Sequence, residues 1–263
     1  MDFRNVVITG ASSGIGAALA RYYAAPGVTL GLIGRDPSRL GDVADQVRGR
    51  AAAAEIGQLD ILDRAALAAF LLQFDRDHPI DLLIANAGIL DGRHAGGSIE
   101  DAATARHVID VNLLGTLDTL HAVLPAMRSR GRGSIALVSS LAALSPLPDA
   151  PAYSASKAGL LSYGLALRAA VAPERVGITV VCPGYVTSGM TAMHIGKHPL
   201  KIGAETAARL IGAGIAKNRA VVGFPLPLYL LALISPLVPE FITRLATRGI
   251  RFHVNRPAAG RAN

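Results

Sequence analysis

Tyr153 and Lys157 are the pair of residues whose types and spacing point most directly to chemistry. Residues four positions apart on an α-helix lie on one face, so the two side chains would point in the same direction. A free phenol has a pKa of about 10, but a nearby ammonium group favours the phenolate and lowers that pKa. The pair could therefore donate or accept a proton at a carbonyl or alcohol oxygen. Ordinary surface Tyr–Lys pairs share this spacing, so the assignment needs other motifs.

The second motif is a glycine-rich segment that follows the first apolar run and opens a helix-like stretch. Its sequence is Thr9-Gly10-Ala11-Ser12-Ser13-Gly14-Ile15-Gly16. Glycines let the backbone turn tightly and approach a pyrophosphate, to which a helix N-terminus offers free N–H groups. The spacing is G-x-x-x-G-x-G rather than the common dinucleotide fingerprint G-x-G-x-x-G. The alternative interpretation is an ordinary glycine-rich turn between a strand and a helix.

Short apolar runs alternate with helix-like stretches and indicate how these motifs are positioned. Continuous apolar runs are typical of strands buried on both faces, and the alternation predicts an α/β domain with a doubly wound parallel sheet flanked by helices. The expected strands are Val6–Thr9, Thr29–Ile33, Leu82–Ala85, Ser134–Ser139 and Ile178–Cys182. The expected helices cover about residues 14–25, 37–49, 63–77, 102–129 and 151–172. We expect one domain, with a catalytic and dinucleotide-binding core at 1–190 and a substrate loop and C-terminal appendage at 191–263.

The motifs occur in the order and spacing of one protein family. Ser140 lies thirteen residues before Tyr153, and the rest of the set is Asn86-Ala87-Gly88, Asn112 and Pro183-Gly184. Over about residues 4–190 the sequence resembles the short-chain dehydrogenases/reductases in their compact single-domain branch. The resemblance implies a Rossmann-like fold and an oxidoreductase that acts on CH–OH donors, transferring a hydride between a nicotinamide and a carbonyl or secondary alcohol.

The resemblance also implies a role for each catalytic residue. Tyr153 is then the general acid in reduction and the base in oxidation, and Lys157 lowers the pKa of Tyr153 and binds the nicotinamide ribose. Ser140 orients the substrate oxygen and stabilises its developing charge. Asn112 holds a water that continues the proton relay. Neighbouring Ser139 would point to the opposite face of a strand.

Cofactor residues follow from the same resemblance. They fall into the phosphate turn, the residues around adenine and its ribose, and those facing the nicotinamide. Besides Tyr153 and Lys157 they are Gly10, Ser12, Ser13, Gly14, Ile15, Gly16, Arg35, Asp60, Ile61, Asn86, Ala87, Gly88, Pro183, Gly184, Val186 and Thr187.

The end of the second expected strand favours NADP(H) over NAD(H). An NAD-dependent enzyme places a carboxylate there for the ribose 2′-hydroxyl, whereas this chain has Gly34 followed by Arg35. A guanidinium suits a 2′-phosphate through paired hydrogen bonds, and Arg39 is a second candidate. The alternative stays open, because a shift of one residue would make Asp36 the ribose ligand. Ser13 is not basic, so the second basic site of many NADP-dependent members is missing.

The cysteine and histidine content excludes other site types. The single cysteine, Cys182, rules out an internal disulfide and is typical of a core residue in a reducing compartment. A strand-like run begins at Val6 with no signal-peptide pattern before it, so we expect a cytoplasmic protein. The histidines are scattered, and His194 and His198 lack a third ligand, so we expect no metal site.

The C-terminal quarter carries the positive charge of the chain. The whole sequence has a net charge of +7, yet residues 197–263 hold ten Lys and Arg and only two acidic residues. An uncharged, mostly apolar stretch at 220–239 contains four prolines and is too interrupted for a transmembrane helix. Five arginines follow it, with Phe241, Leu245 and Phe252 beside them; they are Arg244, Arg248, Arg251, Arg256 and Arg261.

This composition is typical of an element that lies on an anionic membrane, for example at its inner face. An apolar lid or a dimer contact with a solvated basic tail fits equally well. We expect a homo-oligomer, with a dimer favoured, and no nucleic-acid binding, because no recognition motif is present.

Two other functions are alternatives to a hydride-transfer enzyme. One is a dinucleotide-sensing binding protein without catalysis, which a missing Tyr, Lys or Ser would favour. The other is an epimerase or dehydratase of nucleotide sugars, but this chain lacks the larger substrate domain and the G-x-x-G-x-x-G turn. Leu141, Leu144 and Leu147 follow Ser140 and, with the apolar appendage, indicate a hydrophobic ketone or alcohol as substrate.

Overall fold

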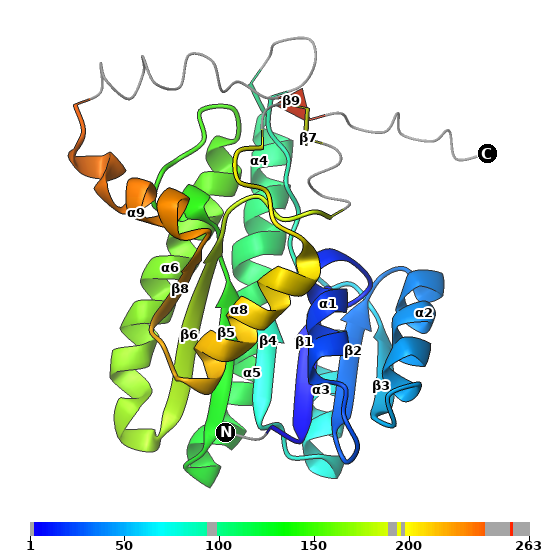
Figure 1. Ribbon diagram of the computed structural model, residues 1–263. Helices are drawn as coiled ribbons and strands as arrows, with labels where there is room; N and C mark the ends of the chain where they lie inside the picture. Colours follow the sequence, from blue (N-terminus) through cyan, green and yellow to red (C-terminus); the bar gives the residue numbers. More distant parts are fainter. Residues whose placement is uncertain (1–2, 94–98, 189–193, 196–197, 240–252, 255–263) are drawn as a thin grey trace.

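A parallel sheet covered by helices on both faces forms the centre of the molecule (Figure 1). The computed structural model describes residues 3–93, 99–188, 194–195, 198–239 and 253–254. Within these residues the sheet has seven strands in the order β3-β2-β1-β4-β5-β6-β8, all paired in parallel. They are β1 (Asn5–Thr9), β2 (Thr29–Gly34), β3 (Ala53–Gln58), β4 (Leu82–Ala85), β5 (Gly133–Val138), β6 (Val176–Pro183) and β8 (Val221–Phe224). A short antiparallel pair joins β7 (His194–Ile195) to β9 (His253–Val254).

The helices cover the sheet because alternate strand residues point to opposite faces. Val6 and Ile8 of β1 pack with α1, α2 and α8, whereas Val7 packs on the other face with α3 and α5. On the first face lie α1 (Gly14–Tyr23), α2 (Pro37–Arg48) and α8 (Ala204–Ala216). On the second lie α3 (Arg64–Asp77), α5 (Gly115–Arg130) and α6 (Pro151–Val171), with α4 (Ala102–Ile109) packed on α6.

The expected Rossmann-like architecture is confirmed. The chain leaves β1 toward β2 on one side and later returns to β4 on the other side, which creates a switch point between β1 and β4. In open parallel sheets ligands bind at the carboxyl ends of the strands at such a point. The glycine turn follows β1 and Asn86 follows β4, so both motifs lie there.

The structure contains elements that the apolar runs did not predict. β3 and β8 lie at the two edges of the sheet, and only one of the six β3 residues is buried, so neither strand has a continuous buried run. α8, β8 and α9 (Leu226–Ile234) come from the region interpreted as an appendage, and α8 and β8 complete the core. The stretch 102–129 is not one helix, because a π-helical turn at Asp110–Leu114 separates α4 from α5.

The apolar C-terminal stretch forms the short helix α9. Among the described residues no helix is both long and apolar enough to cross a membrane. The five late arginines and their aromatic neighbours at 241–252 and 256–261 lie outside the described residues.

Candidate active site

The glycine turn between β1 and α1 has a backbone that only glycine adopts without strain. Gly10 and Gly14 have φ values of 66° and 54°, in the left-handed region that L side chains rarely adopt. A Cβ on Gly16 would lie 2.1 Å from the carbonyl oxygen of Gly10. Ser13 precedes α1 and its side chain makes no capping hydrogen bond in the described structure. These features fit a pyrophosphate cradle, with bare backbone facing a helix N-terminus.

Asn86 holds the glycine turn against the end of β4. Its Nδ2 donates to the carbonyl oxygens of Thr9 (3.0 Å) and Gly10 (3.3 Å). The Thr9 hydroxyl accepts in return from the backbone N–H groups of Asn86 and Ala87, both at 3.0 Å. Asn86 was expected among the cofactor residues, and no separate role was expected for Thr9. The contacts show both residues fastening the two strand ends together.

The residues after β2 include one exposed guanidinium and one carboxylate that caps a helix. The Asp36 side chain accepts from the backbone N–H of Arg39 (3.0 Å) and forms an ion pair with its Nε (2.7 Å), which lowers the pKa of Asp36. This carboxylate caps the start of α2. The Arg35 side chain is 64% exposed, and Asp60 Oδ2 lies 3.5 Å from its Nη1. Gly34 lies beside Ser12 of the glycine turn.

Asp60 and Ile61 follow β3, as expected for residues near the adenine. Asp60 Oδ1 accepts from the backbone N–H of Leu62 at 3.0 Å. Ile61 is buried and would meet a Cβ on Gly115 at 2.9 Å, so its side chain lies over the start of α5. The structure therefore places both residues at the carboxyl edge of the sheet, with Asp60 beside Arg35 and Ile61 against α5.

Tyr153 and Lys157 occupy the first turns of α6 and are both buried, with exposures of 9% and 4%. The Lys157 Nζ donates to the carbonyl oxygen of Val138 at 2.9 Å and lies 5.8 Å from the centroid of the Tyr153 ring. Ser140 lies two residues after β5, where its Oγ accepts from the backbone N–H of Ala142 (3.1 Å), and its side chain is close enough to Tyr153 to lower the pKa of the phenol. The expected trio of Ser140, Tyr153 and Lys157 is thus assembled.

The neighbouring Ser139 contacts the backbone of the trio. Its buried Oγ donates to the backbone carbonyl of Lys157 at 2.7 Å, which ties the end of β5 to α6.

Asn112 lies in the π-helical turn and is fully buried. Its Oδ1 accepts from the Ile89 N–H (2.7 Å), and its Nδ2 donates to the Ile89 carbonyl (2.9 Å) and to Ser156 Oγ (3.2 Å). Ser156 in turn donates to the backbone carbonyl of Tyr153 at 2.7 Å. π-Helical turns are frequent at functional sites. Here the extra residue lets one side chain bridge the loop after β4 and the catalytic helix.

Gly88 completes the contact between that loop and the catalytic residues. A Cβ at this position would lie 3.0 Å from Asn112 Oδ1 and 3.3 Å from Lys157 Nζ. Glycine therefore keeps open the space between the lysine and the loop after β4. The role expected for Asn112 in holding a water stays a prediction.

Burial controls the protonation of the pair. It raises the pKa of Tyr153, and the hydrogen bond with Ser140 partly opposes the rise. It lowers the pKa of Lys157 to about 8. The expected lowering of the Tyr153 pKa by Lys157 is not found in the protein alone, where burial is the largest influence on that pKa. The phenol is therefore protonated at neutral pH, and the lysine is mostly charged.

The residues expected to face the nicotinamide lie together at the carboxyl end of β6. The Gly184 N–H donates to the Phe224 carbonyl at 2.7 Å, and a Cβ on Gly184 would lie 3.2 Å from both Leu141 and Pro225. Val186 is buried. The Thr187 N–H donates to the Ile202 carbonyl at 2.9 Å. Pro183 ends β6, so this loop approaches the turn after Ser140.

Comparison with known proteins agrees with this geometry. The profile of the family described as short chain dehydrogenase matches residues 4–197. An uncharacterized oxidoreductase of Myxococcus xanthus is 33% identical over 95% of this chain and 99% of that protein. This chain is a member of the short-chain dehydrogenase family. It is an oxidoreductase that acts on CH–OH donors with NAD(P).

One solved structure and one further relative are also similar to this short-chain dehydrogenase. A solved short-chain dehydrogenase from Sphingobium yanoikuyae in complex with NADPH superposes with a TM-score of 0.77 and 26% identity, covering 94% of this chain and 96% of that one. A 3-dehydrosphinganine reductase of Arabidopsis thaliana is 36% identical over 70% of this chain and 55% of that protein.

Glu100 caps the catalytic helix of the dehydrogenase, a role that was not predicted from the sequence. Ala150, at the N-cap of α6, has no side chain that could cap it, and the Ala152 N–H donates to Glu100 Oε1 at 2.6 Å. The other carboxylate oxygen, Oε2, is buried with no hydrogen-bond partner among the described residues. Burial raises the pKa of Glu100, and Asp91 adds to the rise. The residue lies 52 positions from its partner, so no local motif could reveal it.

The remaining chemistry-bearing side chains of the enzyme lie in the core or lack a ligand set. Cys182 is fully buried on β6, and burial raises its pKa to about 12, so it is an inert core thiol. His198 packs its ring against Tyr185 at a centroid distance of 5.0 Å. In the part of the chain that the structure describes, no group of three His, Cys, Asp or Glu could hold a metal ion.

Proposed function

We propose that this dehydrogenase reduces a hydrophobic ketone with NADPH, or oxidises the corresponding secondary alcohol with NADP. The observation that carries the proposal is the buried group of Ser140, Tyr153 and Lys157 beside a glycine turn that fits a pyrophosphate. A dinucleotide-sensing protein without catalysis is not favoured, because these three residues are present and lie together.

In this proposal the chain's own groups hold and move the proton. Tyr153, protonated at neutral pH because of its burial, gives its hydroxyl proton to the carbonyl oxygen of the substrate. Ser140 donates a hydrogen bond to the same oxygen as negative charge develops there. The Lys157 ammonium stabilises the phenolate that remains, and Asn112 and Ser156 fix the backbone of α6 behind it. The bound dinucleotide supplies the hydride that completes the alcohol.

Apolar side chains beside Ser140 support a hydrophobic substrate. Leu141 and Leu144 are partly exposed, and α9 contacts the turn Leu141–Ala143. The Ser235 hydroxyl after α9 bonds the Ser145 hydroxyl at 3.1 Å, which holds this helix near the site. The Arabidopsis relative is by its name a 3-dehydrosphinganine reductase. Assay of ketones and secondary alcohols of increasing chain length, followed by cofactor absorbance, tests the proposal; activity only with short polar substrates would contradict it.

The NADP preference is proposed to depend on Arg35. Arg35→Ala should remove most of the difference between NADPH and NADH affinity, because a charge-assisted contact with phosphate contributes about 1.5–3 kcal/mol. Fluorescence titration with both dinucleotides measures the effect. Arg48→Ala is the matched control, because Arg48 is an exposed, ion-paired arginine at the far end of α2 and should change the ratio little. Tighter binding of NADH by the unmodified protein would contradict the proposal and make Asp36 the ribose ligand.

We also propose that α9 docks this enzyme on an anionic membrane. The helix and the turn after it expose a row of large apolar side chains, each at least 43% accessible: Leu226, Leu230, Leu231, Leu233, Ile234 and Leu237. The sequence that follows contributes five arginines and no acidic residue after Glu240. Anionic lipid attracts each such charge by about 1 kcal/mol, and apolar groups insert beside it.

Co-sedimentation with anionic vesicles tests the membrane proposal. The double variant Leu230→Glu/Leu231→Glu should reduce the bound fraction strongly, and high salt should do the same. Leu72→Glu is the control, since Leu72 is equally exposed, at 47%, on α3. Full-length protein that stays in solution at low salt would exclude the membrane. A change in activity or in oligomeric state of the double variant would then identify a lid or a dimer contact.

A further inference from the structure

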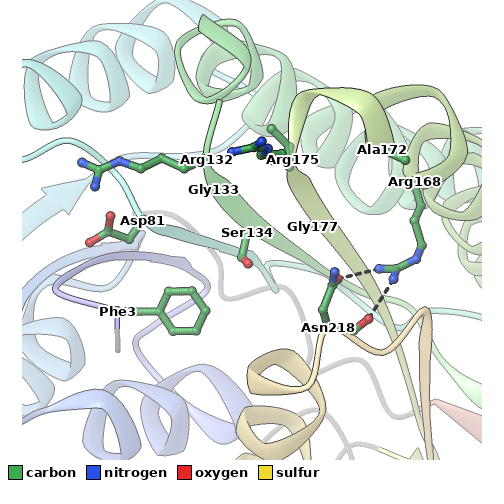
Figure 2. Close-up of a pocket in the computed structure, with 11 residues that line it drawn as sticks. Phe3, Asp81, Arg132, Gly133, Ser134, Arg168, Ala172, Arg175, Gly177 and Asn218 are labelled. Carbon is green, nitrogen blue, oxygen red and sulfur yellow. Dashed lines mark hydrogen bonds between the residues drawn. The ribbon is translucent and has the colours of Figure 1, made fainter. Parts of the chain in front are cut away.

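A cavity of about 500 Å³ opens at the end of the sheet opposite the active site (Figure 2). It is bordered by Gly133 at the start of β5 and Val176 at the start of β6, so it lies at the amino ends of the strands. The catalytic residues lie at the carboxyl ends. The cavity is therefore separate from the dinucleotide site. Its polar side chains are Asp81, Arg132, Ser134, Arg168, Arg175 and Asn218.

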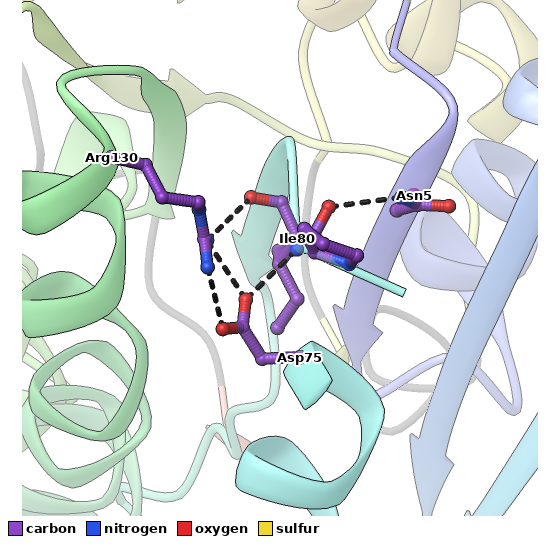
Figure 3. Close-up of polar contacts among 5 residues, drawn as sticks. Asn5, Asp75, Ile80 and Arg130 are labelled. Atoms are coloured by element: carbon purple, nitrogen blue, oxygen red, sulfur yellow. Dashed lines mark hydrogen bonds and ion pairs between the residues drawn. The ribbon is translucent and has the colours of Figure 1, made fainter. Parts of the chain in front are cut away.

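Arginines gather at this end of the molecule, and the protein provides acceptors for three of them. Arg130 forms a two-pronged ion pair with Asp75 at 2.6 and 2.8 Å and also donates to the Ile80 carbonyl (Figure 3). Arg128 forms a similar pair with Glu174. Arg168, in the cavity wall, donates to the carbonyls of Ile178 and Asn218 and to the Asn218 side chain.

Arg132 and Arg175 differ from these three. Both are exposed and line the cavity, and neither guanidinium has a hydrogen-bond or ion-pair acceptor among the described residues. Arg175 also has a φ of 58°, at the left-handed position that ends a short 3₁₀ turn. Glycine or asparagine is favoured there, because a Cβ makes this conformation strained. Glycine would adopt this backbone conformation with less strain, yet the sequence has an arginine here, and that arginine lines the cavity.

The other polar groups of the cavity are also donors. The Ser134 hydroxyl and the Asn218 Nδ2 have no acceptor in the described structure, and the Asn218 Oδ1 is used by Arg168. The acidic lining residue, Asp81, accepts from the backbone N–H groups of Arg4 and Asn5, both at 3.1 Å. Donors without acceptors, and three guanidinium groups against one carboxylate, are the chemistry of an oxyanion site.

We propose that this cavity binds the phosphate or carboxylate group of a small anionic metabolite. Arg132 and Arg175 supply the charge, and Ser134 and Asn218 add neutral donors to the lining. Pockets that hold small molecules have volumes of about 300–1,000 Å³, so the cavity accommodates more than the anion itself.

Calorimetric titration of the protein with inorganic phosphate, with the dinucleotide site saturated by NADPH, tests the proposal. Arg132→Ala and Arg175→Gly should each weaken phosphate binding about tenfold or more, since each removes a charge-assisted contact. Arg175→Gly relieves the left-handed backbone, so the variant keeps its fold. A parallel titration with succinate distinguishes the two anions: the one that binds more tightly identifies the group.

Two control variants match the changes. Ala51→Gly makes the same backbone change at another left-handed residue, with a φ of 59°, and Arg76→Ala removes an exposed arginine on α3 outside the cavity. Both should bind phosphate within about twofold of the parent protein. Absence of binding by either anion, or equal binding by the parent and the Arg132 and Arg175 variants, would overturn the proposal.

Discussion

Replacement of Tyr153 by phenylalanine is expected to lower turnover at least about 100-fold while dinucleotide binding is retained. The phenylalanine keeps the buried ring and removes the hydroxyl that gives the proton to the substrate oxygen. Steady-state turnover with the best ketone from the substrate panel measures the first effect, and NADPH titration by fluorescence measures the second.

Tyr163→Phe is the matched control for this substitution. Tyr163 lies on the same helix, and its hydroxyl is hydrogen-bonded to His121 Nε2 at 2.8 Å, so the variant removes an equivalent group away from the site. Its turnover should stay within a few-fold of the parent value. Turnover of Tyr153→Phe in that same range would contradict the role of Tyr153 as the proton donor.

The sequence predicted the parts of the fold that have a local signal. The central strands are buried on both faces and appear as unbroken apolar runs, and the glycine spacing requires a turn that the φ values of Gly10 and Gly14 confirm. Edge strands lack such a signal because one side meets solvent. Ala53–Gln58 therefore gave no apolar run, and the short strand Val221–Phe224 was hidden within a stretch interpreted as an appendage.

The residues of the candidate site could be predicted from the sequence, but the contacts that they make could not. Tyr153, Lys157, Ser140 and Asn112 were expected together, and the topology brings them together. The partner of Lys157 is the backbone carbonyl of Val138, and a carbonyl has no sequence signal.

Long-range partners were equally invisible in the sequence. The carboxylate that caps the catalytic helix belongs to Glu100, which lies 52 positions before its partner Ala152 in the sequence. The fold pairs Glu174 with Arg128 and Asp75 with Arg130. It leaves the side chains of Arg132 and Arg175 without a carboxylate partner among the described residues. Such facts follow from tertiary packing, which residue types and spacing do not specify.

Replacement of Lys157 by methionine should reduce turnover at least about 100-fold and also weaken dinucleotide binding. Methionine keeps the length and much of the buried volume of the side chain but removes the ammonium that stabilises the Tyr153 phenolate. The Val138 carbonyl then loses its donor at 2.9 Å, an effect that costs about 1–3 kcal/mol of folding free energy. Circular dichroism must therefore show that the variant is folded at the assay temperature. Lys217→Met, at the exposed end of α8, controls for the loss of one positive charge.

The pH profile separates this role from a merely structural one. Burial lowers the pKa of Lys157 to about 8, so the side chain is charged below that pH and loses its proton as the pH rises through it. Loss of the charge removes the stabilisation of the phenolate, so kcat/KM for ketone reduction in the parent protein should fall above about pH 8. The methionine variant has no group to titrate there, and its low activity should be flat across the same range. If the fall near pH 8 persists in Lys157→Met, another group controls it and the lysine acts only by packing against Tyr153 and Val138.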